Sequence, residues 1–126
     1  MKQILQKTIE KHSQNVLFAY LFGSHARGVE VESGDIDIAV FLNEPAVDFV
    51  FDVKIDLYLD LTRALKRNDI DLVMMNRCKN LMLLYGIISD GYVIFDGDPA
   101  TRIDYEQRLL HQAIDFIGQR KMALGI

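Results

Sequence analysis

The sequence contains few residues that cross-link a chain or interrupt its secondary structure, with one cysteine and two prolines among 126 residues. It contains no tryptophan. Because Cys78 stands alone, the chain cannot form an intrachain disulfide or a cysteine-based zinc cluster. We therefore interpret Cys78 as an inert, partly buried thiol. A low cysteine content is typical of proteins that work in a reducing compartment, and we expect this one to be cytoplasmic.

Long hydrophobic runs are also absent. The longest apolar tract, residues 81–88, is far shorter than the ~20 residues that a membrane-spanning helix needs. The first seven residues contain no hydrophobic core of the kind that a signal peptide carries. The sequence predicts a soluble protein with no membrane partner.

An excess of positive charge is the third thing missing, since 14 Lys and Arg oppose 18 Asp and Glu for a formal net charge of −4. A duplex-binding module of this size is usually basic, so we expect no direct nucleic-acid partner. At this length we expect one domain, residues 1–126, that buries roughly two-thirds of its unfolded surface.

Helical and strand-like periodicities alternate along the chain in the order α-β-β-α-β-α-β-α. We expect Asn68 to cap the second helix and Thr101 to cap the last. This order predicts a single α/β (α+β) domain, in which helices flank a small mixed β-sheet. The predicted helices cover residues 2–14, 45–67, 80–89 and 101–123, and the predicted strands cover 16–22, 35–42, 69–74 and 92–95.

The most informative pattern joins a Gly-Ser turn to a pair of aspartates. Gly23 and Ser24 follow an apolar strand, and Asp35 and Asp37 open the next one. Residues two apart share a face of a strand, so the two carboxylates project together beside the turn. Mg²⁺ is usually held by one or two carboxylates and by substrate phosphates. The pattern predicts a magnesium–triphosphate site and hence phosphoryl or nucleotidyl transfer.

Each half of this pattern also has an ordinary interpretation. Gly-Ser is common in plain turns, and Asp-x-Asp can mark the polar face of an edge strand. The combination is more specific, because two like charges at the start of a buried strand are costly unless a cation compensates them. The third predicted strand brings Asp69 and Asp71 as further carboxylates.

With these residues in place, the run from Gly23 to Val40 resembles the polymerase-β-type nucleotidyltransferase superfamily. The chain length and the segment Ile70–Asn76 resemble its minimal nucleotidyltransferase (MNT) branch. The branch contains the MntA-type antitoxins of HEPN/MNT toxin–antitoxin modules. The resemblance covers most of the chain, from Val16 to the last helix, and implies a polymerase-β-like nucleotidyltransferase fold.

The resemblance also implies a role for each site residue. Gly23 and Ser24 would hold the nucleotide phosphates, as helix amino ends do. Asp35, Asp37 and Asp71 would be catalytic residues that bind two Mg²⁺ ions, a geometry suited to in-line displacement.

The third carboxylate and two loop residues each have two interpretations. We prefer Asp71 to Asp69 as the third carboxylate, since we expect Asp69 to face solvent. Arg27 either binds a nucleotide phosphate or pairs with a surface glutamate nearby. His25 either lines the nucleotide pocket or, as we expect, is a solvent-exposed loop residue.

By this resemblance the chain is an Mg²⁺-dependent nucleotidyltransferase that uses ATP as its substrate. It would move AMP onto a tyrosine of a cognate HEPN ribonuclease toxin, silence that toxin, and so act as an antitoxin in a hetero-oligomer. About thirty residues follow the last strand, too few for a substrate-binding domain, which favours a protein acceptor. Two alternatives remain: transfer to a small molecule such as an aminoglycoside, and a non-catalytic antitoxin that masks its toxin sterically.

Overall fold

The computed structural model describes residues 1–26 and 34–125, and its elements follow the expected order. Two single-turn 3-10 helices, η1 and η2, follow strands β1 and β3 directly. None of the described helices is long and apolar enough to cross a membrane. The elements are α1 (Lys2–Glu10), β1 (Val16–Phe22), η1 (Gly23–His25), β2 (Ile36–Leu42), α2 (Val47–Leu65), β3 (Ile70–Met74), η2 (Met75–Arg77), α3 (Leu81–Asp90), β4 (Tyr92–Asp96) and α4 (Pro99–Ala123).

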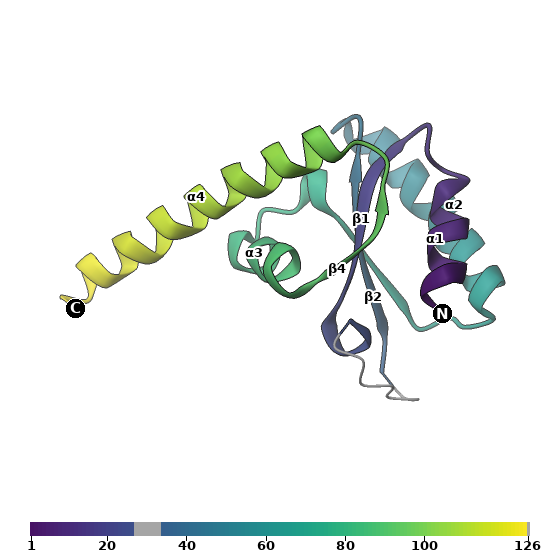
Figure 1. Cartoon of the computed structure of the whole chain (residues 1–126), viewed down its shortest axis with the longest axis horizontal. Coiled ribbons are helices and arrows are strands. Elements are labelled where there is room, and N and C mark those ends of the chain that lie inside the picture. The colour runs from purple at the N-terminus through teal and green to yellow at the C-terminus, as the bar shows by residue number, and fades with distance from the viewer. Residues whose placement is uncertain (27–33, 126) are drawn as a thin grey trace.

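The four strands form one mixed sheet in the order β3-β2-β1-β4. Strand β1 runs antiparallel to both of its neighbours, whereas β2 and β3 are parallel. Helices α1 and α2 cover one face of this sheet, and α3 and α4 cover the other (Figure 1). The predicted fold, a small mixed sheet flanked by helices, is confirmed.

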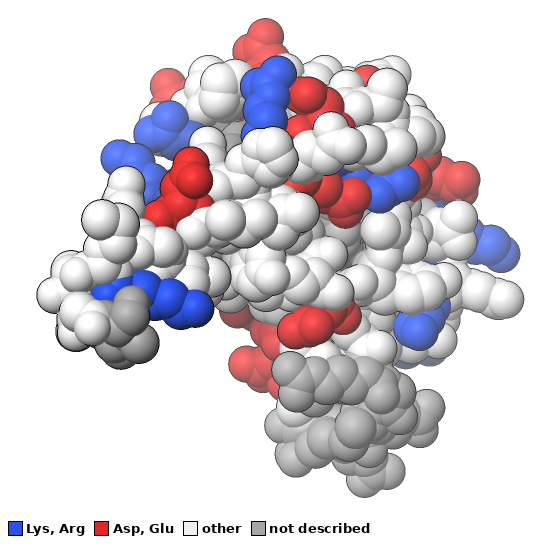
Figure 2. All heavy atoms as spheres, turned by 60° about the vertical axis from the view of Figure 1, so that its left-hand side comes forward, with Lys and Arg blue, Asp and Glu red and all other residues white. Residues whose placement is uncertain are grey.

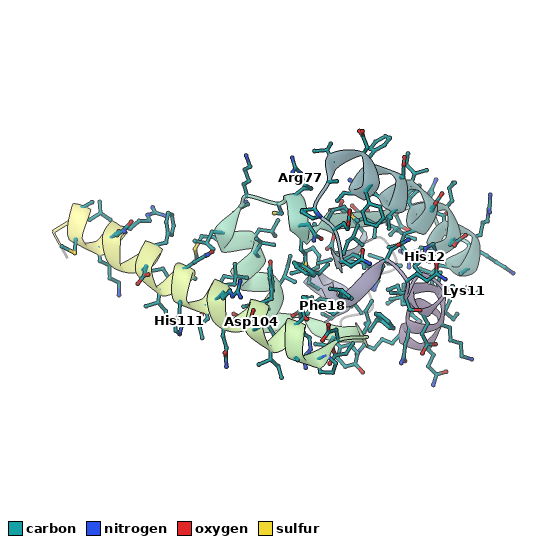
Figure 3. All side chains as sticks on the ribbon, turned by 90° about the horizontal axis from the view of Figure 1, so that it is seen from above. Lys11, His12, Phe18, Arg77, Asp104 and His111 are labelled. Carbon is teal, nitrogen blue, oxygen red and sulfur yellow. The ribbon has the colours of Figure 1, made fainter. Side chains whose placement is uncertain are left out.

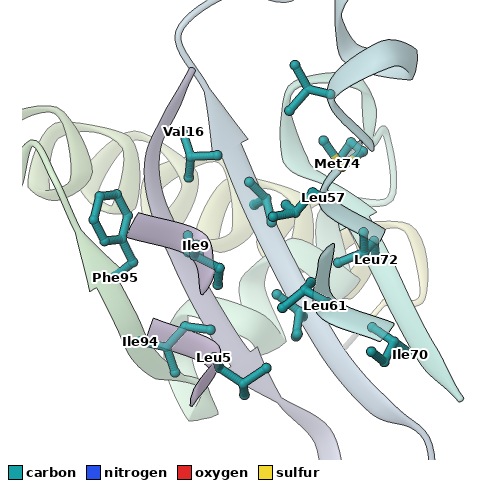
Figure 4. Packing of buried hydrophobic residues seen from close by; sticks show 14 of the residues in the cluster. Leu5, Ile9, Val16, Leu57, Leu61, Ile70, Leu72, Met74, Ile94 and Phe95 are labelled. Carbon is teal, nitrogen blue, oxygen red and sulfur yellow. The ribbon is translucent and has the colours of Figure 1, made fainter. Parts of the chain in front are cut away.

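The face under α1 and α2 carries the larger hydrophobic cluster (Figure 4). Leu5 and Ile9 of α1 and Leu57 and Leu61 of α2 have no exposed surface. Their spacing of four places them on one side of each helix, which is what an amphipathic sequence provides. Each such buried side chain contributes about 1.5–3 kcal/mol relative to an exposed one, so this layer stabilises the packing of both helices on the sheet.

The opposite face packs aromatic side chains against α3 and α4. The rings of Phe18 and Phe41 stack with centroids 4.7 Å apart. Tyr20 is buried beside them, and its hydroxyl donates a hydrogen bond to Glu106 of α4 (2.9 Å). Because both faces of β1 are covered, its sequence is apolar throughout rather than alternating.

Helix α4 packs on the body through its residues up to Ala113, and Leu109 and Ala113 are buried there. Its carboxyl-terminal end extends away from the rest of the protein (Figures 1 and 3). The exposed side chains there include Ile114, Phe116 and Met122.

Two helix starts differ from the predictions. Asp98, not Thr101, caps α4: its carboxylate accepts hydrogen bonds from the Thr101 backbone N–H (3.1 Å) and hydroxyl (2.7 Å). Pro99 then occupies the first turn, where its missing N–H costs nothing. Helix α2 begins at Val47, two residues after Pro45.

Two helix ends also differ. Helix α1 stops at Glu10, and residues 11–15 form tight turns that bring His12 within 2.6 Å of Asp60 on α2. Helix α2 ends at Leu65, and its cap residue is Lys66, whose φ of 55° is left-handed, rather than Asn68. Instead the Asn68 carbonyl accepts a hydrogen bond from Tyr58 (3.1 Å).

Candidate nucleotide and metal site

The pairing of the strands brings two of the predicted carboxylates together. In the parallel ladder between β2 and β3, Asp37 lies directly opposite Asp71. Both side chains project toward the face that α3 and α4 cover, because Ala39 and Val73, two residues further along the same strands, belong to that core. The two aspartates sit at the end of the sheet, beyond the residues that the helices bury.

Gly23 lies against this pair from the neighbouring strand. Asp37 is the register partner of Phe22, the last residue of β1, so Gly23 follows immediately beside it. The φ of Gly23 is +73°, a conformation that other residues rarely adopt. A Cβ placed there would collide with the Asp37 carboxylate. Glycine is therefore favoured at this position for two independent reasons, the backbone conformation and the close contact with the Asp37 carboxylate.

Electrostatics connect a third carboxylate to the pair. Burial raises the pKa of Asp37, and the neighbouring charges of Asp71 and then Asp35 raise it further, while His25 acts in the opposite direction. Asp35 and Asp71 are exposed and Asp37 is half-buried. Acidic side chains are also visible at this end of the molecule in Figure 2, just above the grey atoms.

These three oxygen donors are the type that Mg²⁺ prefers. Their mutual repulsion would be relieved by a divalent cation, so the donor set fits the expected metal. Within residues 1–26 and 34–125, however, no group of three or more His, Cys, Asp or Glu side chains is already drawn together for metal coordination. The structure places Asp37 and Asp71 side by side, with Asp35 at the entrance to β2.

The expectation for His25 is wrong. Its side chain is buried, with 8% exposed, rather than solvent-exposed. Nε2 lies 3.2 Å from the carbonyl oxygen of Gly34, which can only accept a hydrogen bond. The 3-10 turn η1 directs the ring back toward the start of β2, a placement that no local sequence pattern specifies.

The sequence did not indicate that Arg67 contacts the residues beside the carboxylates. Arg67 donates two hydrogen bonds to Asp69, at 2.8 and 2.5 Å, and a third to the Gly34 carbonyl at 3.0 Å. This guanidinium lowers the pKa of Asp69. Asp69 is therefore paired rather than simply solvated as expected, and Asp71 is the carboxylate of β3 that lies beside Asp37.

Two predicted nucleotide-binding residues, Arg27 and Ser24, remain to be placed. Arg27 lies outside the described residues, as do Glu30 and Glu32, so both roles considered for Arg27 stay predictions. Ser24 follows Gly23 in η1, the short turn that begins where β1 ends. Its backbone is thus placed next to Gly23, as a phosphate-binding turn requires.

Comparison with known proteins adds to this geometry. The family model described as "Polymerase beta, Nucleotidyltransferase" matches residues 3–100. The chain belongs to this nucleotidyltransferase family. The match spans every strand of the sheet and both acidic strand starts, so the resemblance inferred from Gly23, Asp35 and Asp37 is confirmed at the level of the family. A sequence search among curated proteins finds no match.

Solved structures with this nucleotidyltransferase fold are similar over nearly the whole chain. A toxin–antitoxin structure with AMP-PNP gives a TM-score of 0.77 at 19% identity, covering 98% of this chain and 95% of the other. A mutant MntA toxin–antitoxin structure gives 0.78 at 18% identity, covering 99% and 96%. A complex of tri-AMPylated Shewanella oneidensis HEPN toxin with MNT antitoxin gives 0.71 at 20% identity, covering 99% and 97%. At these identities the likeness establishes the fold.

Proposed function

We propose that the chain transfers AMP from ATP to a tyrosine hydroxyl of a HEPN-type toxin and thereby acts as its antitoxin. The observation that carries the proposal is the placement of Asp37 opposite Asp71 with Gly23 packed against them. Family membership supports nucleotidyl transfer. The similar solved structures support the acceptor, since they are toxin–antitoxin complexes and one contains an AMPylated HEPN toxin.

In this proposal Gly23 and Ser24 bind the nucleotide phosphates through backbone N–H groups at the start of η1. Arg27 contributes a guanidinium to the same phosphates. Asp35, Asp37 and Asp71 hold Mg²⁺. The bound ions would polarise the α-phosphate and neutralise charge on the leaving pyrophosphate.

The chemical step is an in-line displacement at the α-phosphorus. The acceptor oxygen forms the new P–O bond, the bond between the α-phosphorus and the bridging oxygen breaks, and pyrophosphate leaves. Asp71 accepts the proton of the attacking hydroxyl, since it is exposed and lies beside Asp37. The products are an AMP ester of the acceptor, pyrophosphate and one proton.

Two residues other than the carboxylates would hold the start of β2 in place. Arg67 and His25 both reach the Gly34 carbonyl, one residue before Asp35. They are positioning residues, because they act on the backbone that carries Asp35 rather than on the nucleotide. We also propose that residues 1–126 act as one domain in the cytoplasm, where ATP is available and Cys78 stays reduced.

Intact-mass spectrometry tests this function. The chain is incubated with its co-expressed HEPN-type partner, ATP and Mg²⁺, and the partner's mass is followed. We expect steps of one AMP that disappear with Asp37→Ala. Asp48→Ala is the matched control, since Asp48 is an exposed aspartate on α2.

Each other outcome of that experiment would point away from the proposal. A stable complex without a mass change would favour steric masking of the toxin. Equal activity of Asp37→Ala and the wild type would remove the metal site from the mechanism. No complex and no modification would direct the search to small-molecule acceptors.

A further inference from the structure

A hollow of about 220 Å³ opens directly beside Gly23, between the end of β1 and helix α3. We call it the α3 hollow. Its wall is mainly apolar, and Asp90 supplies a carboxylate at its edge. The residues that line it are Phe22, Gly23, Met82, Leu83, Gly86, Ile87 and Asp90.

The α3 hollow lies on the same sheet face as the carboxylates. Phe22 belongs to the core cluster under α3 and α4, the face toward which Asp37 and Asp71 also project. Across the sheet the order is Asp71 on β3, Asp37 on β2, then Phe22 and Gly23 on β1. A ligand with phosphates at Gly23 and metal at the aspartates therefore has the hollow at its other end.

Gly86 lines the hollow, and no close neighbour requires a glycine at this position. It lies inside α3, where glycine costs roughly 0.5–1 kcal/mol relative to alanine. A Cβ added at Gly86 would meet no atom within 4 Å. The missing side chain leaves open space next to the site, which a ligand can use.

The rim shows apolar surface that the described part of the chain leaves uncovered. Met82 is 41% exposed and Leu83 is 37% exposed. Apolar walls with a few polar groups are the usual lining of small-molecule sites. At about 220 Å³ the hollow is smaller than pockets that enclose drug-sized ligands, so it suits one ring system rather than a whole nucleotide.

We propose that the α3 hollow binds the nucleobase of the nucleoside triphosphate. The flat ring lies on Met82 and Leu83 over Gly86, and the Asp90 carboxylate accepts a hydrogen bond from an exocyclic amino group of the base. This inference rests on the proposed function, since it places the triphosphate at Gly23 and the carboxylates. It assigns base recognition to α3, an element that carries none of the phosphate or metal residues.

The test compares a nucleotide with its phosphate chain alone. Calorimetry measures the Kd of Mg²⁺·AMP-PNP and of Mg²⁺·tripolyphosphate for the wild type and for Gly86→Leu, whose side chain fills the hollow. We expect the Kd for AMP-PNP to rise roughly tenfold or more, within the range measured for loss of stacking on one base. The Kd for tripolyphosphate should stay within about twofold.

Gly86→Ala is the matched control, because it adds one methyl group to open space and raises helix propensity. It should bind AMP-PNP more tightly than Gly86→Leu does and unfold at no lower temperature than the wild type. If Gly86→Leu does not fold, Leu83→Ala replaces it, and removal of this exposed wall should weaken AMP-PNP binding alone.

Three results would overturn the proposal. Unchanged binding of AMP-PNP by Gly86→Leu would show that the base lies elsewhere. Equal weakening of both ligands would indicate damage to the Gly23 turn. An unchanged Kd for AMP-PNP with a raised KM for the protein acceptor would assign the hollow to the acceptor's ring. Nucleotide binding that follows the expected pattern, in a protein that transfers no AMP, would leave this inference standing while refuting the proposed function.

Discussion

Substitution of Gly23 by alanine tests two separate effects of the turn, its contribution to the stability of the fold and its contribution to nucleotide binding. At a φ of +73°, an L-residue other than glycine costs about 1–2 kcal/mol. For a domain of this size that corresponds to a fall of about 3–10 °C in Tm. The added Cβ also collides with the Asp37 carboxylate, a short side chain that can rotate away. The fold should therefore survive, while Asp37 leaves the position opposite Asp71.

We expect Gly23→Ala to lose Mg²⁺-nucleotide binding and AMP transfer by far more than its Tm predicts. Differential scanning fluorimetry with and without Mg²⁺·AMP-PNP measures both effects in one assay. Gly23→Asn distinguishes the two causes, because asparagine tolerates a left-handed backbone but carries a Cβ. It should regain part of the Tm and none of the nucleotide-induced shift.

Gly118→Ala is the control, since it is a glycine in α4 whose added Cβ would meet nothing within 4 Å. It should keep the full nucleotide-induced shift. Wild-type nucleotide affinity in Gly23→Ala would refute the argument that contact between Gly23 and Asp37 builds the site.

Four further predictions concern charge, capping and packing. Burial and neighbouring carboxylates raise the pKa of Asp37 in the folded state above its unfolded value, so the folded state loses stability as the pH rises from the unfolded value through the raised pKa. Asp37→Asn should therefore raise the urea midpoint at about pH 8 without metal and leave it nearly unchanged near pH 3, where the carboxyl is mostly protonated in both states. Arg67→Ala should slow AMP transfer with little effect on folding, and Arg67→Lys should restore less than half of the loss in a rate assay, since lysine cannot pair in bidentate fashion. Asp98→Ala should cost about 1 kcal/mol in urea unfolding through loss of the α4 cap; an unchanged midpoint would contradict that role. Leu57→Ala should cost about 2–5 kcal/mol, because the side chain is fully buried between α2 and the sheet, and a smaller loss would mean that the core can collapse around the cavity.

Local patterns in the sequence predicted the elements and part of the site. The uninterrupted apolar run of β1 predicted a strand at the residues where it formed, and the apolar spacing of α2 predicted an amphipathic helix within two residues of its observed bounds. The site could be recognised from Gly23 together with the Asp35–Asp37 pair. A plain turn does not need to be followed by two aspartates, and an edge strand does not need a Gly-Ser turn before it, so the combination indicated a binding site. Gly86 also left a signal, a glycine inside a predicted helix, which is unfavourable without a special reason.

Tertiary structure alone decided which residues meet. That Asp71 rather than Asp69 lies beside Asp37 follows from the parallel register of β2 and β3, which are separated by an entire helix in the sequence. The hydrogen bond from Arg67 to the Gly34 carbonyl joins residues 33 apart in the sequence, and the contact of His25 with the same carbonyl joins the turn after β1 to the start of β2. Periodicity is a property of neighbours along a chain, whereas a site is made by residues far apart that only packing brings together. The sequence by itself therefore determined the chemistry that is present, and the fold determined where the carboxylates, the turn and the α3 hollow come together.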